Sequence, residues 1–207
     1  MLVIKHTLIK SLQSVKKKID FFLFSEHSRK KSGKWFDKFE KQVRSLPNIN
    51  CNALLGTEVK VLDFKGNVDI SARIKKKCDL VMVSVHRFPG ETGDIKKNKL
   101  DLNNKDIIDI EYELSRAAIK HSEFDILGHP FGMSLKRFKI KPPFNLYENL
   151  MKYCKKYNKA FEINYNYHKN PKKILNACLK YNVLVSLGSN SHKLDEVGKV
   201  LDEKYWS

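Results

Sequence analysis

Five short apolar runs each lead to a side chain that can bind a metal ion or transfer a proton. In chain order these are His27 after FFLFS, Glu58 at the end of ALLGTE, His86 at the end of LVMVSVH, His129 at the end of FDILGH and His192 shortly after VLVSLGS. Imidazole and carboxylate together suit zinc, iron or manganese better than magnesium or calcium, which prefer shells of oxygen atoms. A carboxylate such as Glu58 can bridge two cations, and paired cations can activate a water while neutralising the charge of a phosphoryl oxygen.

The elements that must position these side chains alternate between strand and helix. Apolar runs without polar alternation, typical of strands buried on both faces, lie at 21–25, 53–58, 80–86, 124–129, 160–164 and 183–189. Helical spacing of apolar residues occurs at 8–19, 107–119, 146–157 and 174–181. The alternation predicts an α/β fold with a mainly parallel strand set. Because the carboxyl ends of such strands converge, residues far apart in sequence would face one cavity.

Two regions interrupt the alternation. Residues 60–70 contain Lys65, Gly66 and Asn67 between two short β-like pieces, which predicts a hairpin insertion. Residues 88–104 and 132–143 are rich in Lys and Asn and predict loops. The 207 residues carry no interdomain linker or repeat of fixed short period, so we expect a single domain over residues 1–207.

The charge balance is strongly basic. Lys and Arg number 40 and Asp and Glu 23, for a net charge of +17, which favours anionic partners such as phosphate esters, nucleic acid or acidic lipid. No apolar run approaches the ~18 to 20 residues of a membrane span, and the first ten residues lack the features of a secretory leader. We therefore expect a cytoplasmic protein without a membrane partner. Four widely separated cysteines indicate neither a disulfide framework nor a zinc ribbon, and the oligomeric state stays open.

The ordered motifs resemble those of the polymerase and histidinol phosphatase (PHP) domain family. The motifs are SEHS (25–28), LGTEV (55–59), SVHRF (84–88), ILGHP (126–130), FEIN (161–164) and SLGSNSH (186–192). The resemblance covers roughly residues 21–198, and the order and spacing of several motifs make it more specific than any one of them. It implies a distorted (β/α)7 TIM-like barrel with a cleft for up to three metal ions at the carboxyl ends of the strands. Family members are typically phosphoesterases.

The resemblance implies a ligand set. Glu58 would be the bridging carboxylate, His86 and His129 would complete one metal position, and His27 with His192 would contribute to another. Asn190 stands where the family usually has an Asp ligand and would be a weaker one. The family's opening His-x-His-Thr strand can be laid on VIKHT, which puts Ile4 at the first His and His6 at the second. Alternatively, that first strand is absent through truncation or an upstream start.

Further residues near these motifs have candidate supporting roles. Arg87, next to His86, would clamp a phosphate with its planar donor fork or be a surface residue. Glu162 and Asn164, at the end of FEIN, would orient the metal-bound histidines from behind. Lys136, Arg137, Lys139 and Lys141 follow His129 and would line the mouth of the cleft. We expect His121 and His168 to be solvated.

Together these residues predict a metal-dependent phosphoesterase. Two or more divalent cations, zinc, manganese or iron, would activate a metal-bound water for attack on a phosphate ester. The substrate would be a phosphorylated small molecule such as histidinol phosphate, or a nucleotide or nucleic-acid phosphate. The alternative is a catalytically weakened protein of the same fold that binds RNA or another polyanion through its basic surface, as a protein subunit of ribonuclease P does.

Overall fold

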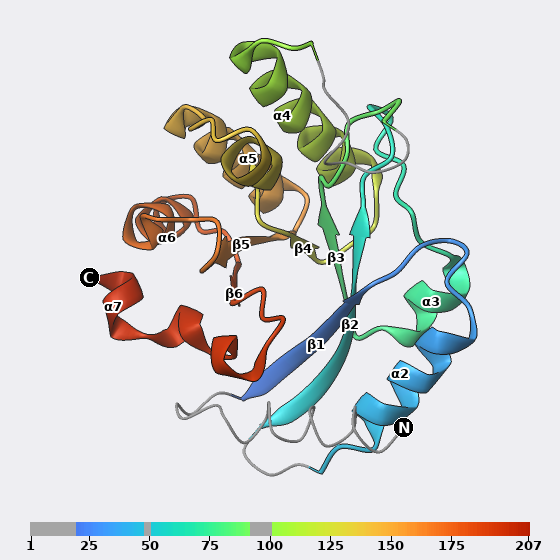
Figure 1. Ribbon diagram of the computed structural model, residues 1–207. Coiled ribbons are helices and arrows are strands. Elements are labelled where there is room, and N and C mark those ends of the chain that lie inside the picture. The colour runs from blue at the N-terminus through green and yellow to red at the C-terminus, as the bar shows by residue number, and fades with distance from the viewer. Residues whose placement is uncertain (1–19, 48–50, 92–100) are drawn as a thin grey trace.

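The sheet of the protein is parallel throughout and its strand order follows the chain. A computed structural model describes residues 20–47, 51–91 and 101–207. Within them six strands pair in the order β1-β2-β3-β4-β5-β6, each parallel to the next. The strands are β1 (Phe21–His27), β2 (Asn52–Lys60), β3 (Leu80–Ser84), β4 (Ile126–Leu127), β5 (Ala160–Asn164) and β6 (Val185–Gly188). The sheet curls into a half-barrel (Figure 1).

The helices lie outside the curl of the sheet (Figure 1). They are α2 (Lys34–Arg44), α3 (Ala72–Lys77), α4 (Asn104–His121), α5 (Phe144–Lys156), α6 (Pro171–Lys180) and the short C-terminal α7 (Glu203–Trp206). A π-helical turn (Met133–Arg137) follows β4, and two 3-10 turns (Leu194–Glu196 and Lys199–Leu201) follow β6. Side chains cap the starts of three helices, because Ser71, Asn103 and Asn170 accept the first free backbone N–H groups of α3, α4 and α6.

The predicted fold class is confirmed, and all six predicted strands are present. Three of the four predicted helices correspond to α4, α5 and α6, whereas the predicted helix at 8–19 lies outside the described residues. The described strands form a half-barrel: no pairing joins β6 to β1 in that part of the chain. The family's opening strand was either aligned with VIKHT or taken to be absent. Both interpretations concern residues 1–19, which lie outside the described residues.

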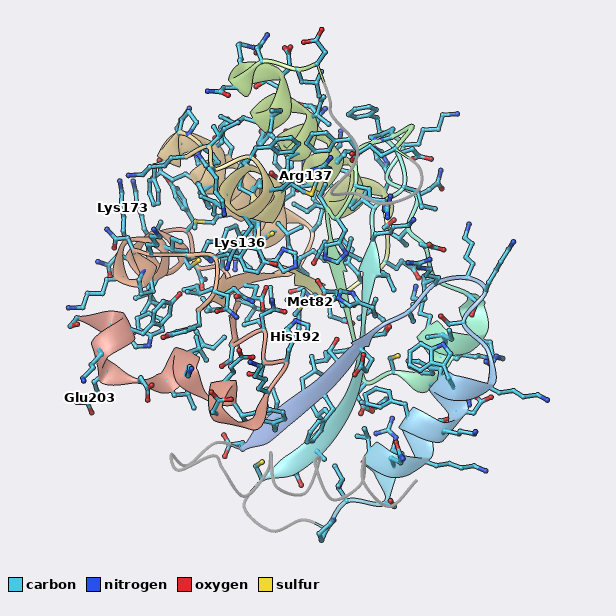
Figure 2. The ribbon with its side chains drawn as sticks, in the orientation of Figure 1. Met82, Lys136, Arg137, Lys173, His192 and Glu203 are labelled. Atoms are coloured by element: carbon cyan, nitrogen blue, oxygen red, sulfur yellow. The ribbon has the colours of Figure 1, made fainter. Side chains whose placement is uncertain are left out.

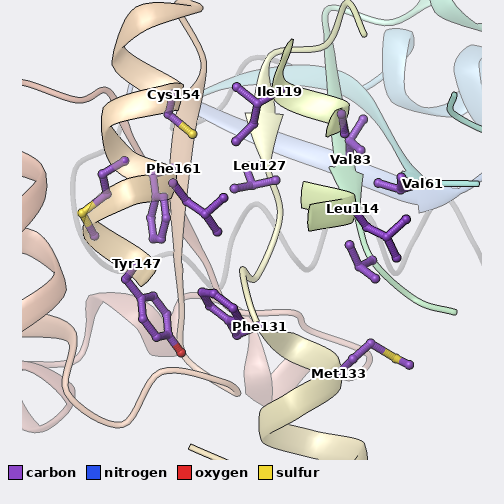
Figure 3. Packing of buried hydrophobic residues seen from close by; sticks show 14 of the residues in the cluster. Val61, Val83, Leu114, Ile119, Leu127, Phe131, Met133, Tyr147, Cys154 and Phe161 are labelled. Atoms are coloured by element: carbon purple, nitrogen blue, oxygen red, sulfur yellow. The ribbon is translucent and has the colours of Figure 1, made fainter. Parts of the chain in front are cut away.

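The outer face of the sheet is apolar because the helices cover it. In the strand register Val59 lies beside Val83, Val83 beside Leu127 and Leu127 beside Phe161. All four are buried in the larger core, where Figure 3 shows Leu127 between Ile119 of α4 and Phe161 of β5. A smaller core joins β1 and β2 to α2 and α3 and consists of Phe24, Phe36, Phe39, Val43, Cys51, Leu55 and Ile74.

Near the carboxyl ends of the strands, the inner face carries polar and very small residues instead. Because successive strand residues point to opposite faces, Glu58 faces inward between Thr57 and Val59, and Ser84 does so after Val83. Glu162, Asn164 and Gly188 occupy the equivalent places on β5 and β6. Those polar side chains are buried and hydrogen-bonded to one another. The inner face near the carboxyl ends is thus the part of the sheet that can hold chemistry.

Some local predictions need correction. Helix α2 was not predicted, although Phe36, Phe39 and Val43 are buried along one of its faces. The predicted loop at 132–143 contains the π-helical turn, with Met133 buried in the core. The predicted hairpin insertion is present as a single antiparallel bridge between Val61 and Val68.

The structure also bears on the expectations for the cysteines and for membrane-spanning segments. The four cysteines are free thiols, three of them buried and Cys78 half-buried. Among the helices that the structure describes, none has the length and apolar character needed to cross a membrane.

Candidate metal centre

Glu58 lies at the centre of a group of imidazoles contributed by three other segments. Its Oε1 atom is 2.8 Å from His129 Nε2 and 3.0 Å from His86 Nε2, and the two Nε2 atoms are 3.3 Å apart. Glu58 lies near the end of β2, two residues before Lys60, whereas His86 and His129 stand just after β3 and β4. The structure brings these three predicted residues together at neighbouring strand ends.

The spacing of these three atoms fits a metal ion. Zinc lies about 2.0 to 2.1 Å from imidazole nitrogen and carboxylate oxygen, so adjacent ligand atoms in a tetrahedral shell are about 3.3 Å apart. The three observed separations, 2.8, 3.0 and 3.3 Å, are near this value. Glu58 Oε1, His86 Nε2 and His129 Nε2 therefore form a triangle that one divalent cation could cap.

The second carboxylate oxygen of Glu58 points toward His27. His27 Nδ1 is 3.7 Å from Glu58 Oε2, and the His27 and His86 rings meet edge to face with their centroids 5.1 Å apart. Single ligand atoms of His27, Glu58 and His86 all lie within 4.8 Å of one another. The His27 side chain is 60% exposed, so this side of the group is open to solvent. Glu58 thus presents one oxygen to each of two places, as a bridging carboxylate would.

The charge states of this group are set by burial and by the pairing of Glu58 with histidines. Burial opposes ionisation of Glu58, but the hydrogen bonds and charges of His129 and His86 hold its pKa well below the usual range. Burial lowers the pKa of His86 despite its contact with Glu58. Burial also acts to lower the pKa of His129, but the contact with Glu58 outweighs it and the pKa is raised. A carboxylate that stays ionised in a buried place is suited to a cation.

Buried neighbours fix the positions of Glu58 and His129. The Ser84 hydroxyl donates to Glu58 Oε1 at 2.8 Å. The backbone N–H of His129 donates to the carboxylate of Glu162, and Asn164 Nδ2 donates to the other oxygen of Glu162 at 2.9 Å. Glu162 therefore holds the backbone of His129 rather than its imidazole, and Asn164 holds Glu162.

His129 adopts an uncommon backbone conformation, with φ of +26°. Its side chain is only 5% exposed, and among the described residues its Nδ1 atom has no hydrogen-bond partner. A β-carbon on Gly132 would lie 2.6 Å from that atom, so the chain can turn back at this point only with glycine. The imidazole stacks on Tyr167, with ring centroids 4.5 Å apart and an angle of 15° between the planes. These contacts leave the Nε2 edge of His129 facing Glu58.

The expectation that His168 is solvated is wrong. The side chain is 2% exposed, its Nδ1 accepts the backbone N–H of Asn164 at 3.0 Å, and its Nε2 donates to the carbonyl of Pro130 at 3.2 Å. The prediction failed because the surrounding Lys and Asn residues indicated an open loop. His121, in contrast, is exposed as expected.

In the part of the chain that the structure describes, the remaining predicted site residues make no hydrogen bond or ion pair with Glu58, His86 or His129. His192 is exposed, and its backbone N–H donates to Glu196 at 2.7 Å. Asn190 has a positive φ of 46°, typical of a turn, and its carbonyl accepts from Asn166 at 3.3 Å. Arg87 is half-buried, and its charge contributes to lowering the pKa of Glu91. His6 lies outside the described residues.

Two residues at this centre were not singled out from the sequence. Ser84 precedes His86 by two positions, and this spacing on a strand was a usable signal that both point to one face. Tyr167 gave no such signal, because it follows β5 in a segment without periodicity, and only the folded chain brings it to His129.

Comparison with known proteins gives relatives named as phosphatases. No family model matches the chain. A probable phosphatase of Clostridium novyi is 31% identical over 163 residues, which are 72% of this chain and 58% of that protein. A probable phosphatase of Thermoanaerobacter is 27% identical over 197 residues, which are 90% of this chain and 72% of that protein. The chain spans about six tenths of the length of the first relatives that it matches.

Solved structures share the fold at low sequence identity. A putative histidinol phosphatase of Listeria monocytogenes superposes with a TM-score of 0.70 at 13% identity, over 95% of this chain and 91% of the other. The histidinol phosphate phosphatase of Lactococcus lactis, complexed with zinc, L-histidinol and phosphate, gives 0.60 at 14% identity, over 95% and 86%. An archaeal ribonuclease P structure gives 0.50. These likenesses establish the half-barrel fold.

Proposed function

We propose that this protein is a metal-dependent phosphoesterase of the PHP type that hydrolyses a phosphomonoester. The observation that carries the proposal is the triangle of Glu58 Oε1, His86 Nε2 and His129 Nε2, with separations of 2.8 to 3.3 Å. Relatives named probable phosphatases support a phosphoesterase over the alternative of a polyanion-binding protein.

Within this proposal Glu58, His86 and His129 hold one cation, and Glu58 shares its other oxygen with a second cation beside His27. A bound zinc, manganese or iron ion would polarise a phosphoryl oxygen and lower the pKa of a water. The protein's own part is to keep Glu58 ionised, to fix it through Ser84, and to anchor the backbone of His129 on Glu162. His192 and Asn190 would approach the second cation through the loop after β6.

The proposed substrate is a small phosphorylated molecule of the histidinol phosphate class. The similarly folded Lactococcus lactis protein is complexed with histidinol and phosphate. A net charge of +17 favours a dianionic phosphomonoester over a neutral ester.

The test measures metal content and phosphatase turnover in the same samples. The purified protein, loaded in turn with zinc, manganese and iron(II), is assayed with p-nitrophenyl phosphate and with histidinol phosphate, and elemental analysis gives the bound metal. We expect His86→Ala and Glu58→Gln each to lower metal retention and to reduce kcat at least 100-fold, because each removes one of three converging ligands. His121→Ala is the matched control, since it removes an exposed imidazole elsewhere.

Unchanged turnover in folded His86→Ala would contradict the proposal. A metal-free protein without turnover, combined with salt-sensitive binding of RNA, would favour the polyanion-binding alternative instead.

A further inference from the structure

The ammonium of Lys136 lies over an aromatic ring that also contacts the candidate metal centre. Lys136 extends from the π-helical turn after β4, and its Nζ atom lies 5.3 Å from the centre of the Tyr167 ring. Lys136 is exposed, and the described residues give its ammonium no carboxylate partner. The next residue differs, because Arg137 forms an ion pair with Glu91 at 2.7 Å. Figure 2 shows Lys136 nearer than Arg137 to the middle of the molecule, where Met82 of β3 lies.

The same tyrosine also touches the candidate metal centre. Tyr167 stacks on His129 with ring centroids 4.5 Å apart, so one aromatic ring contacts both a candidate metal ligand and the Lys136 ammonium. The ring has little freedom, because Gly132 faces both His129 and Tyr167 closely: a β-carbon there would be 3.1 Å from Tyr167 Cε1.

We propose that Lys136, supported on the Tyr167 ring, is the phosphate-binding cation of this site. The inference rests on the proposed function and names the group that recognises its substrate. An ammonium held over an aromatic face keeps its charge. Because it is already positioned, it loses less conformational entropy on binding an anion than a free lysine side chain does. The ammonium would bind the non-bridging oxygens of a phosphomonoester dianion placed against Glu58, His86 and His129.

The ring thus acts as a platform that brings a surface lysine to the metal centre. The ammonium of Lys136 would bind the more highly charged anion more tightly, because a phosphomonoester dianion gains more Coulomb energy from it than the monoanion of a phosphodiester does. The site would consequently favour terminal phosphates over internal ones.

The experiment compares Lys136→Ala with Lys173→Ala in the metal-loaded protein. Lys173 is a matched control, because its Nζ also lies over an aromatic ring, 4.0 Å from the centre of Phe144, but on helix α6. For p-nitrophenyl phosphate we expect Lys136→Ala to raise KM roughly 10- to 100-fold, the value of one charge-assisted hydrogen bond, while kcat falls much less. Inorganic phosphate, titrated by calorimetry, should bind more weakly by the same factor. Lys173→Ala should match the wild type in both measurements.

Substitutions at Tyr167 test the platform. Tyr167→Phe keeps the ring and should retain most of the phosphate affinity, whereas Tyr167→Leu removes it and should weaken phosphate binding as Lys136→Ala does. In the double variant the two losses should not add, because both report one arrangement. Additive losses would show that Lys136 acts without the ring and would overturn the platform.

Failure of this inference is distinguishable from failure of the proposed function. Turnover with the same KM and phosphate affinity in Lys136→Ala would overturn the phosphate-binding role and leave the phosphoesterase in place. Phosphate binding that depends on Lys136, in a protein without any turnover, would overturn the phosphoesterase and leave the phosphate-binding role of Lys136 in place. No binding of inorganic phosphate by the metal-loaded wild type would also overturn the role of Lys136.

Discussion

Glu162 shows how a residue that is not a proposed ligand can set the position of one that is. Its carboxylate is buried, accepts the backbone N–H of His129, and accepts from Asn164 Nδ2 at 2.9 Å. Burial raises the pKa of this carboxyl, so its hydrogen bonds matter for keeping it in place. Gly188 on the neighbouring strand β6 leaves the space that the carboxylate occupies.

The first prediction is that Gly188→Ala displaces Glu162. The added β-carbon would lie 1.8 Å from Glu162 Oε1 and 3.0 Å from Asn164 Nδ2, so the carboxylate must rotate and release His129. Overpacking and an unpaired buried donor each cost about 1 to 3 kcal/mol, and we expect a loss of about 2 to 3 kcal/mol in the free energy of unfolding together with weaker metal retention. Urea unfolding and elemental analysis measure the two effects.

Ser186→Ala supplies the control for that substitution, because Ser186 is two residues earlier on β6, beside Glu162 in the register, and the change adds no atom. We expect it to be near the wild type. Equal stability and metal content in Gly188→Ala and wild type would show that Glu162 does not position His129.

Among the elements, the turn after β5 links two strand ends that carry the site. His168 donates to the carbonyl of Pro130, next to His129, and accepts the backbone N–H of Asn164. The C-terminal helix α7 reinforces this turn, since the Tyr205 hydroxyl lies 3.0 Å from the carbonyl of Asn164 and 2.9 Å from that of His168. The turn is thus part of the framework of the site rather than a solvent-exposed loop.

The second prediction concerns the pH dependence that His168 confers. Burial lowers the pKa of His168 from 6.5 to about 4, so on acidification the unfolded chain takes up this proton before the folded one does. Its contribution to stability is therefore complete above pH 6.5 and is lost as the pH falls toward 4. In His168→Gln the amide can accept and donate at the same places but does not titrate. Between pH 7.5 and pH 5 the wild type should lose about 2 kcal/mol more than this variant.

Urea unfolding of both proteins at several pH values gives this difference, and other titrating groups cancel in the comparison. His121→Gln, at an exposed histidine, should follow the wild type at every pH. Identical pH profiles for the wild type and His168→Gln would mean that His168 is not held neutral in the folded state.

The elements also show what could be predicted from the sequence. The six strands were predictable because short apolar runs are buried on the outer face by helices, and Glu58, His86 and His129 followed because they stand at the ends of such runs. Helix α2 was missed because its apolar positions lie among many charged residues. Tyr167 and His168 could not be predicted, because their positions depend on contacts between segments far apart in sequence and not on a local period.

At the scale of the whole molecule, the overall basic charge and the site itself contribute separately to the binding of an anionic substrate. The net charge of +17 is spread over the chain, whereas the proposed phosphate contact is one ammonium, Lys136. A distributed charge attracts an anionic substrate over distances that salt shortens, because the screening length is about 10 Å at 0.1 M and about 3 Å at 1 M ionic strength. A direct contact between an ammonium and a phosphate is shorter than the screening length at 0.1 M, so salt affects it less than it affects the long-range attraction.

The third prediction follows from this separation. Raising sodium chloride from 0.02 to 0.5 M should lower kcat/KM for p-nitrophenyl phosphate about 10-fold while kcat changes little, because salt weakens the encounter and not the chemistry. Lys136→Ala should start from a lower kcat/KM but show nearly the same dependence on salt, since it leaves most of the net charge. Steady-state kinetics across the salt series measure both. A kcat/KM independent of salt would exclude long-range attraction, and a salt dependence that disappears in Lys136→Ala would place the whole electrostatic effect at that one residue.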